Sequence, residues 1–380
     1  MANSVIIDGL RSPIGLKNGK IFNEDLGIVT RADDLSADVL KSLIDKVGVD
    51  KNIYEDFVLG CAFPEGPQGM LMARGVTVLS DLPNTVAASV VNRFCGSSMD
   101  AVHQVSTSIE SNDIEFGLAG GVEDMFGVPM GGGWPSFNDS LSEKEFYIGM
   151  GETAENLAQE LSISREDQED FAVDSHKKAL KAQSEGRFDN EIAPININGT
   201  MVSKDEGPRE PNLDKIRSLN PAFDANGTIT PATSSPISIG ASMIAISSEG
   251  KAKSLGIKPK FRIRGRAVAG VDWRVMGSGP LPATEKVLKK CNMTMNDIDA
   301  IELNEAFAAQ SLYVIRKGGW DQSKINLNGG AIALGHPLGC SGSRIIITLM
   351  NVMEQNNLNT GLATMCIGTG QGIATVIERI

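Results

Sequence analysis

Cysteine and histidine are both scarce in this chain: its 380 residues contain five cysteines and three histidines. The cysteines are odd in number and widely spaced, so they do not outline a disulfide framework, and we expect a reducing compartment. Neither a Cys-x-x-Cys nor a His-x-x-x-His spacing occurs, so we expect no bound metal. The cysteines are Cys61, Cys95, Cys291, Cys340 and Cys366.

Long apolar runs and a surplus of basic charge are also missing. No stretch approaches the ~20 apolar residues of a membrane span. The first residues lack the basic and apolar regions of a signal peptide, so we expect a cytoplasmic protein. The 35 basic and 47 acidic residues give a net charge of −12, which argues against nucleic acid and anionic membranes as partners. An anionic small ligand needs only a local basic pocket and stays compatible with this charge.

The order of predicted elements indicates α/β layering. Residues 4–8 form a predicted strand, residues 35–47 carry apolar side chains at helical spacing, and residues 57–60 have the pattern of a buried strand. Between about residues 124 and 236, glycine and proline punctuate the chain around helices, one of them capped by Ser164. We interpret this region as a loop-rich insert, after which the alternation resumes.

The two parts that flank the insert echo each other. Cys95 and Cys340 each stand before a predicted helix, and each helix is followed at similar distance by Gly-Leu-Ala and an apolar strand. A single triplet is weak evidence, but the shared order of elements favours two similar halves.

Cys95 is the first candidate for chemistry. It stands between a predicted strand at residues 86–91 and a helix that carries Val102, Val105 and Ile109 on one stripe. Backbone N–H groups and the helix dipole at such a turn favour a nucleophilic thiolate. Position alone leaves the alternative of a buried, inert cysteine open.

His336 is the second candidate. It lies in a segment with five glycines between residues 329 and 342, bounded by a predicted strand at 325–327 and a predicted helix at 343–353. Pro337 disfavours helical backbone at His336, and a histidine fixed in a loop can act as a general base. We interpret His103 and His176, which lie on helical stretches, as surface or packing residues.

Two further segments end predicted strands. Residues 366–372, between strands at 362–365 and 373–377, have the pattern of a glycine-rich hairpin, and they lack the Lys-Ser/Thr ending of a P-loop. Asn304 follows the strand at 301–303 and stands where the N-cap of the next helix is expected.

Together these segments resemble the four signature blocks of the thiolases, in the family's order, and the similarity runs from about Ser4 to the C-terminus. Three stretches of sequence most resemble the degradative 3-ketoacyl-CoA thiolases, among them the thiolase subunit of the bacterial fatty-acid oxidation complex. These stretches are the residues around Cys95, Val122-Glu123-Asp124-Met125, and residues 366–374. The blocks are Asn92-Arg93-Phe94-Cys95-Gly96-Ser97-Ser98, Asn304-Glu305-Ala306-Phe307, Gly329 to Gly342, and Cys366-Ile367-Gly368.

The resemblance implies an α/β thiolase fold: two similar βαβαβαββ halves in a five-layer α-β-α-β-α arrangement with an inserted loop domain. It implies an N-terminal half at 1–120 plus about 239–258, a loop domain covering coenzyme A at 121–238, and a C-terminal half at 259–380.

The resemblance also implies the chemistry. Cys95 matches the nucleophile that forms the acyl-enzyme, His336 the residue that activates it, and Cys366 the acid/base that serves the acetyl-CoA enolate and the incoming coenzyme A. His336 and a water held by Asn304 match one oxyanion hole. The N–H groups of Cys95 and Gly368 match the other.

For coenzyme A, which is a substrate, Ser235 and Met150 match residues beside the pantetheine arm, and Arg209 is a candidate for the nucleotide phosphates. The resemblance implies no cofactor, no metal, acyl-CoA as the other substrate, a homodimer or larger homo-oligomer, and a multifunctional hydratase/dehydrogenase subunit as a candidate partner.

Three positions depart from the family pattern. Ile239 stands where Asp is usual, so we expect a local hydrogen bond to be lost. Thr369 replaces a glycine, and Gly149 stands where short-chain biosynthetic members often carry His.

The alternatives are an acetoacetyl-CoA thiolase and a non-catalytic lipid-binding relative. The intact Cys95, His336 and Cys366 argue against the second. A ketoacyl-ACP-synthase-like enzyme is disfavoured because its site uses one cysteine.

Overall fold

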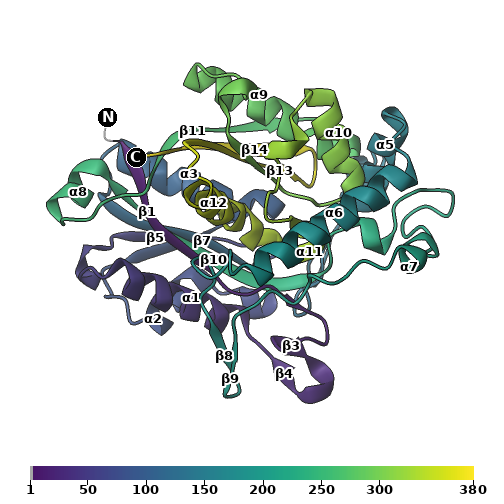
Figure 1. Cartoon of the computed structure of the whole chain (residues 1–380). Helices are drawn as coiled ribbons and strands as arrows, with labels where there is room; N and C mark the ends of the chain where they lie inside the picture. The colour runs from purple at the N-terminus through teal and green to yellow at the C-terminus, as the bar shows by residue number, and fades with distance from the viewer. Residues whose placement is uncertain (1–2) are drawn as a thin grey trace.

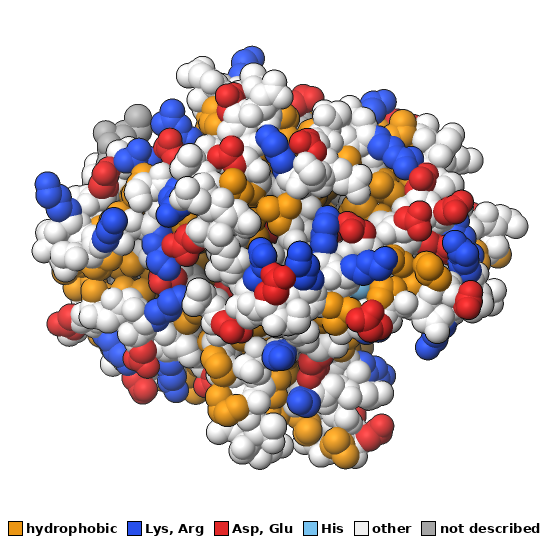
Figure 2. All heavy atoms as spheres, viewed as in Figure 1, with side chains coloured by type: hydrophobic (Ala, Val, Ile, Leu, Met, Phe, Trp, Pro, Cys, Tyr) orange, Lys and Arg blue, Asp and Glu red, His pale blue; other side chains and the backbone are white. Residues whose placement is uncertain are grey.

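The computed structural model describes residues 3–380 and shows five layers (Figure 1). Two sheet halves enclose the central helices α3 (Ser97–Glu110) and α12 (Leu338–Gln355). The outside of one half is covered by α1 (Ala32–Val47) and α2 (Met72–Leu79), and the outside of the other by α9 (Pro280–Cys291) and α10 (Ala308–Gly318). This arrangement is the predicted α-β-α-β-α order. No helix within residues 3–380 is long and apolar enough to cross a membrane. On the face in Figure 2, basic and acidic side chains are interspersed.

The strands form one continuous path whose two halves have matching orders. β5 runs parallel to β6 and β7, β12 runs parallel to β13, and the other neighbours are antiparallel. The halves join where β1 and β11 pair through only two residue pairs, Val5 with Arg262 and Ile6 with Phe261. The path is β12 (Ala300–Leu303), β13 (Thr360–Ile367), β14 (Gln371–Arg379), β11 (Phe261–Gly270), β1 (Ser4–Arg11), β10 (Ser238–Ser248), β7 (Phe116–Asp124), β5 (Asp56–Gly60) and β6 (Ala87–Val91), with β2 (Gly15–Leu16) beside β10.

The duplication is visible in this path. From the junction outward, β1, β10, β7, β5 and β6 of one half correspond to β11, β14, β13 and β12 of the other. The counterpart of β6 is reduced to a single bridge between Ile325 and Ile301. The prediction of a strand at 325–327 is therefore wrong, because Asn326 has a left-handed backbone (φ +47°) that ends the pairing.

The helices follow apolar stripes in the sequence. The predicted stripe of α1 is confirmed, since Leu35, Val39 and Leu43 are fully buried against the sheet. Ser164 caps α6 by accepting the Asp167 N–H, as predicted. The longer helices are α1 (Ala32–Val47), α2 (Met72–Leu79), α3 (Ser97–Glu110), α5 (Met150–Glu160), α6 (Arg165–Ser184), α9 (Pro280–Cys291), α10 (Ala308–Gly318) and α12 (Leu338–Gln355).

The chain between β7 and β10 forms no part of the large sheet. It contains α5, α6 and a small hairpin, and it wraps around the end of the sheet near α11 (Figure 1). The short elements of the chain are α4 (Asp139–Ser142), α7 (Leu213–Arg217), α8 (Glu249–Ser254), α11 (Ala331–Leu334), the hairpin β3 (Phe22–Asn23) with β4 (Ile28–Val29), and the hairpin β8 (Ile195–Ile197) with β9 (Thr200–Val202).

A buried ion cluster ties this segment to the first strand. Arg11, at the end of β1, donates two hydrogen bonds to Asp205 (2.7 and 2.9 Å) and one to Glu191 (2.7 Å). Asp205 also accepts the Ile14 N–H at 2.8 Å. The side chains of all three charged residues are essentially inaccessible to water, so each depends on its partners to offset desolvation.

We therefore expect Asp205→Ala to lower the free energy of unfolding by about 3–5 kcal/mol, because it leaves Arg11 under-compensated. Asp33→Ala is the matched control, since the Arg31–Asp33 pair has the same 2.7 Å separation but an exposed arginine. The control should cost about 1 kcal/mol or less. Denaturant midpoints measure both, and equal shifts would contradict a stabilising role for the buried cluster.

Candidate active site

Cys95 lies on a tight turn between β6 and α3, as the sequence predicts. The turn is a single 3₁₀ element, Phe94–Gly96, and Phe94 has a left-handed backbone (φ +42°). Asn92 Oδ1 accepts the Phe94 N–H at 2.9 Å, and Ser97 Oγ accepts the Arg93 N–H at 2.9 Å. These local bonds hold the strained turn and place Cys95 at the N-terminal end of α3.

The thiol of Cys95 is protonated at rest, which corrects the prediction of a thiolate. The backbone N–H groups of Gly368 and Cys95 hydrogen-bond its sulfur and favour the charged form. Burial outweighs them and raises the pKa of Cys95 to about 11. A thiol in this state needs a base to become a nucleophilic thiolate.

His336 is held in a loop between two helices. α11 ends at Leu334, Gly335 has φ +114°, and Pro337 is the N-cap of α12. The backbone N–H of His336 donates to Ser238 Oγ at 3.0 Å, and the side chain is 3% exposed. The helix begins at Leu338, five residues before the predicted start, so the imidazole lies directly beside its N-terminus.

The hydrogen bonds of His336 identify its tautomer. Ser341 Oγ donates its only hydrogen to the Pro337 carbonyl (2.9 Å), so it accepts from His336 Nδ1 (2.5 Å). Nε2 is then the unprotonated nitrogen, and Asn304 Nδ2 donates to it at 3.3 Å. Burial, and secondarily the charge of Arg344, lowers the pKa of His336 to about 3. The imidazole is a neutral base whose accepting nitrogen is Nε2.

Asn304 contacts His336, and the alternative that it caps the next helix is wrong. α10 begins at Ala308 with Phe307 as its N-cap. Asn304 follows β12, which runs parallel to β13, and its N–H donates to Thr364 O at 3.1 Å. Its Oδ1 is buried without a partner among residues 3–380. A buried amide oxygen in this state is suited to hold a water molecule.

Cys366 is the penultimate residue of β13 and lies near Cys95. The two sulfurs are close enough that a charge on Cys95, together with burial as the larger cause, raises the pKa of Cys366 well above its usual range. The predicted hairpin is confirmed, because Ile367 pairs with Gln371 across a turn of three residues. Thr369 in that turn has φ +66°, a conformation that costs a β-branched residue ~1–3 kcal/mol.

Two of the predicted coenzyme A contacts lie close to these groups. A Cβ at Gly368 would be 3.4 Å from the sulfur of Met150, the first residue of α5. Ser235 is fixed by its N–H, which donates to Ala306 O at 3.0 Å, and Ser234 bridges to Phe307. The segment that carries Ser235 therefore runs beside the segment that carries Asn304.

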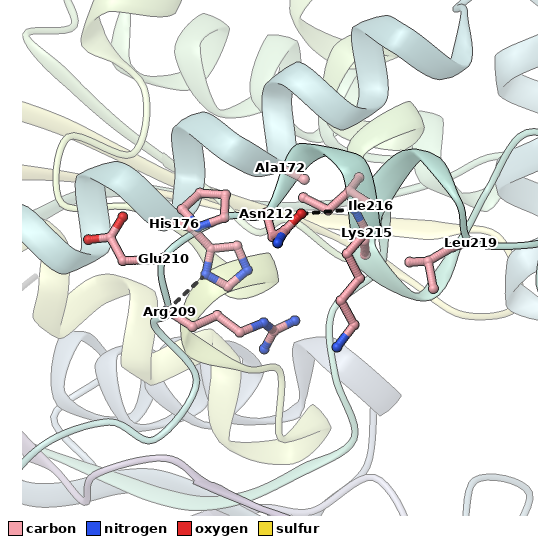
Figure 3. Close-up of a pocket in the computed structure, with 10 residues that line it drawn as sticks. Ala172, His176, Arg209, Glu210, Asn212, Lys215, Ile216 and Leu219 are labelled. Atoms are coloured by element: carbon pink, nitrogen blue, oxygen red, sulfur yellow. Dashed lines mark hydrogen bonds between the residues drawn. The ribbon is translucent and has the colours of Figure 1, made fainter.

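Arg209 lies apart from the cysteines, in a pocket of about 460 Å³ between α6 and α7. Its backbone N–H donates to His176 Nδ1 at 3.4 Å. Lys215 also lines the pocket, and its side chain projects to the same side as that of Arg209 (Figure 3). Both basic side chains are exposed, so the pocket presents two positive charges to an anionic group.

Sequence reasoning missed several supporting residues. Lys215 gave no motif signal, and Ser341 stands five positions after His336, where a loop spacing predicts no contact. Glu123 is fully buried and accepts N–H groups from Ala62 (2.7 Å) and Gly339 (2.8 Å). It thereby joins the N-terminus of α12 to the loop after β5.

The departures from the family pattern have local explanations. Ile239 is completely buried in an apolar cluster and pairs with Asp124 and Gly15, so apolar packing occupies this position. Gly149 is the N-cap of α5, and its N–H donates to Glu152 at 3.1 Å. Within residues 3–380, no group of three or more histidine, cysteine or acidic side chains could hold a metal ion.

Comparisons with known proteins agree on one family. Family models described as "Thiolase, N-terminal domain" and "Thiolase, C-terminal domain" match residues 4–250 and 257–379. A 3-ketoacyl-CoA thiolase of Aliivibrio fischeri is 48% identical over the whole of both chains. One from Acinetobacter baylyi is 47% identical over 99% of this chain and 98% of its own. The crystal structure of an acetyl-CoA acetyltransferase from Bacillus anthracis superposes with a TM-score of 0.91 at 36% identity, covering 100% of this chain and 99% of its own.

The neutral state of His336 has a measurable consequence for stability. Its pKa is about 3 when folded and about 6.5 when unfolded, so below pH 6.5 the unfolded chain binds a proton that the folded chain does not. As the pH falls, the free energy of unfolding of the wild type therefore decreases through this group by up to about 1.4 kcal/mol per pH unit. His336→Gln lacks this decrease, so its free energy of unfolding relative to that of the wild type should rise as the pH falls from 6.5 to 5.

Denaturant unfolding at several pH values measures this difference. Leu312→Ala is the control, because it removes a buried side chain that does not titrate, and its stability difference should be independent of pH. A His336→Gln difference that also stays constant from pH 6.5 to 5 would show that the folded imidazole is not held neutral.

Proposed function

Because the chain belongs to the thiolase family, we propose that it cleaves 3-ketoacyl-CoA with coenzyme A, giving acetyl-CoA and a shortened acyl-CoA. One observation carries this proposal: Cys95 lies near enough to Cys366 for its charge to act on that thiol, and Asn304 Nδ2 donates to His336 Nε2. The names of the 46–49% identical relatives support the 3-ketoacyl substrate.

The first half of the reaction uses the neutral thiol–imidazole pair. His336 Nε2 takes the Cys95 proton as the sulfur attacks the 3-keto carbonyl, so charge develops only when substrate is present. Protonation of Nε2 breaks the hydrogen bond from Asn304 Nδ2. The protonated Nε2, with a water on Asn304 Oδ1, then donates to one oxyanion. The N–H groups of Cys95 and Gly368 donate to the other. One such donor is typically worth ~3–4 kcal/mol.

Cys366 completes the cycle. The acetyl-CoA enolate leaves Cys95 acylated and takes a proton from Cys366, which then removes the proton of incoming coenzyme A. The new thiolate attacks the acyl-enzyme and releases the shortened acyl-CoA. The Cys366 thiol is suited to the first step because it is protonated at rest.

For coenzyme A itself, we propose that residues 121–238 form the covering loop domain between an N-terminal half (1–120 with about 239–258) and a C-terminal half (259–380). Ser235 and Met150 would contact the pantetheine arm. Arg209, joined by Lys215, would bind phosphate at the nucleotide end. The pocket between α6 and α7 supports this placement because its two cations face the same opening.

An acetoacetyl-CoA thiolase is the second candidate, and the superposition on an acetyl-CoA acetyltransferase favours it. The higher identity of the 3-ketoacyl-CoA thiolases and the presence of Gly149 weigh against it. Thiolysis rates with 3-ketoacyl-CoA substrates of four to sixteen carbons separate the two.

The mechanism predicts different losses for the two cysteines. Cys95→Ser should reduce thiolysis by at least a thousandfold while coenzyme A still binds, because a serine hydroxyl cannot replace a thiolate at neutral pH.

Cys366→Ala should still accept an acyl group from a reactive acyl-CoA but lose proton–deuterium exchange at the acetyl-CoA methyl group. Thiolysis assays and exchange in heavy water measure both, and normal exchange in Cys366→Ala would refute its acid/base role.

We also propose a homodimer, supported by an apolar edge of the molecule. β6 is the edge strand of its half-sheet. Near it Met70 is 100% exposed and Leu71 53% exposed, both with left-handed backbone, and Val78 on α2 is 59% exposed. An unpaired edge beside exposed apolar side chains is typical of a surface that another chain covers.

Size-exclusion chromatography with light scattering should therefore give a mass of at least two chains. Met70→Asp with Val78→Asp should shift the protein toward monomer, whereas Met201→Asp, on β9, should not. A stable, active wild-type monomer would refute the dimer.

The family resemblance supports two further proposals: a role in fatty-acid β-oxidation beside a hydratase/dehydrogenase subunit, and a cytoplasmic location, where a reducing environment keeps Cys95 and Cys366 as thiols. Co-purification from the native host tests the partner. A dimer or tetramer that never associates with such a subunit would mark a free-standing enzyme.

A further inference from the structure

An apolar groove of about 500 Å³ opens where the start of β10 meets β2 and β3. This volume is in the range of ~300–1,000 Å³ that small-molecule sites occupy. Phe22 and Phe126 stack in its wall, with ring centroids 4.4 Å apart. Its apolar lining consists of Leu16, Phe22, Met125, Phe126, Pro236 and Ile237.

One end of the groove adjoins the catalytic groups. The Met125 N–H donates to Ser238 O at 3.3 Å, and Ser238 Oγ in turn accepts the N–H of His336. The side chain of Met125 belongs to a small apolar cluster against which Cys95 packs. Ile237 lies between Ser235, the proposed pantetheine contact, and Ser238. Met125 therefore belongs both to the lining of the groove and to the apolar cluster beside Cys95.

The lining suits a hydrocarbon chain. Ile237 is 52% exposed, although its neighbours Ser238 and Ile239 are completely buried. The two charged residues of the lining, Lys17 and Glu24, are of opposite sign and exposed, so the groove offers no net charge to an ionic ligand. Water released from Ile237 and Phe126 would favour an apolar occupant.

We propose that this groove binds the acyl chain of a medium- or long-chain 3-ketoacyl-CoA, and that Met125 and Ile237 direct the chain away from Cys95. This inference rests on the proposed function and adds the place where chain length is sensed. Each methylene buried there contributes about fourfold in affinity, so affinity rises with chain length until the groove is filled.

The test compares Ile237→Asp with Met201→Asp, a matched control whose methionine is 58% exposed on β9, outside the groove. The measured quantity is the ratio of kcat/KM for the sixteen-carbon 3-ketoacyl-CoA to kcat/KM for acetoacetyl-CoA. Ile237→Asp should lower this ratio at least tenfold, and Met201→Asp should leave it as in wild type. An unchanged ratio in Ile237→Asp would overturn the assignment.

Calorimetric titration of Cys95→Ser with palmitoyl-CoA and with coenzyme A separates this inference from the proposed function, because this variant cannot form the thioester and only binding is measured. Cys95→Ser should bind palmitoyl-CoA at least tenfold more tightly than coenzyme A, and adding Ile237→Asp should remove most of that difference. If the difference depends on Ile237 but no 3-ketoacyl-CoA is cleaved, the proposed function fails and the groove stands. If cleavage is normal but the difference is independent of Ile237, the groove assignment fails. Dissociation of Ile237→Asp into monomers would also overturn it, because the groove would then be covered by a second copy.

Discussion

The close crossing of α3 and α12 is the constraint on which the site depends. Ser98 Oγ donates to Cys340 O (3.0 Å) and accepts the Ser343 N–H (2.9 Å), so one hydroxyl joins the first turns of both helices. A Cβ at Gly342 would collide with the backbone N–H of Met99, so only glycine permits this approach. Because Cys95 precedes α3 and His336 precedes α12, the crossing places both residues at the starts of two helices that are in contact. The small residues near both helix starts therefore serve packing first, and the chemistry depends on that packing.

Desolvation is the second organising effect, because it decides the protonation states. Backbone N–H groups around Cys95 favour a thiolate, yet burial raises its pKa to about 11 and lowers that of His336 to about 3. The resting site is therefore uncharged, and it holds donors where negative charge will develop. A site of this kind does not hold a permanent buried ion pair, which would be costly to desolvate. In the proposed mechanism, the thiol is therefore activated only after the substrate has bound.

Sequence patterns predicted most of the fold because apolar periodicity and small-residue turns are local signals. The stripe of α1, the cap at Ser164, the turn at Cys95 and the hairpin after Cys366 are all found where they were expected. The failures come from tertiary context. Asn304 has the local pattern of a helix cap, but the parallel pairing of β12 with β13 turns it toward His336. The strand at 325–327 shrinks to one bridge, and the thiolate expected from a helix N-terminus is overridden by burial, which no local pattern reports.

The central claim is that Cys95 takes the acyl group of the 3-ketoacyl-CoA after a neighbouring neutral base removes its proton, with Cys366 left unacylated. Its most direct test is mass spectrometry of the intact protein after rapid mixing with a 3-ketoacyl-CoA in the absence of added coenzyme A, followed by peptide mapping. The account predicts one added acyl group per chain, shorter than the substrate by the acetyl unit and located on Cys95. An acyl group found on Cys340, Cys291 or Cys366, or no covalent adduct despite measurable thiolysis, would contradict it.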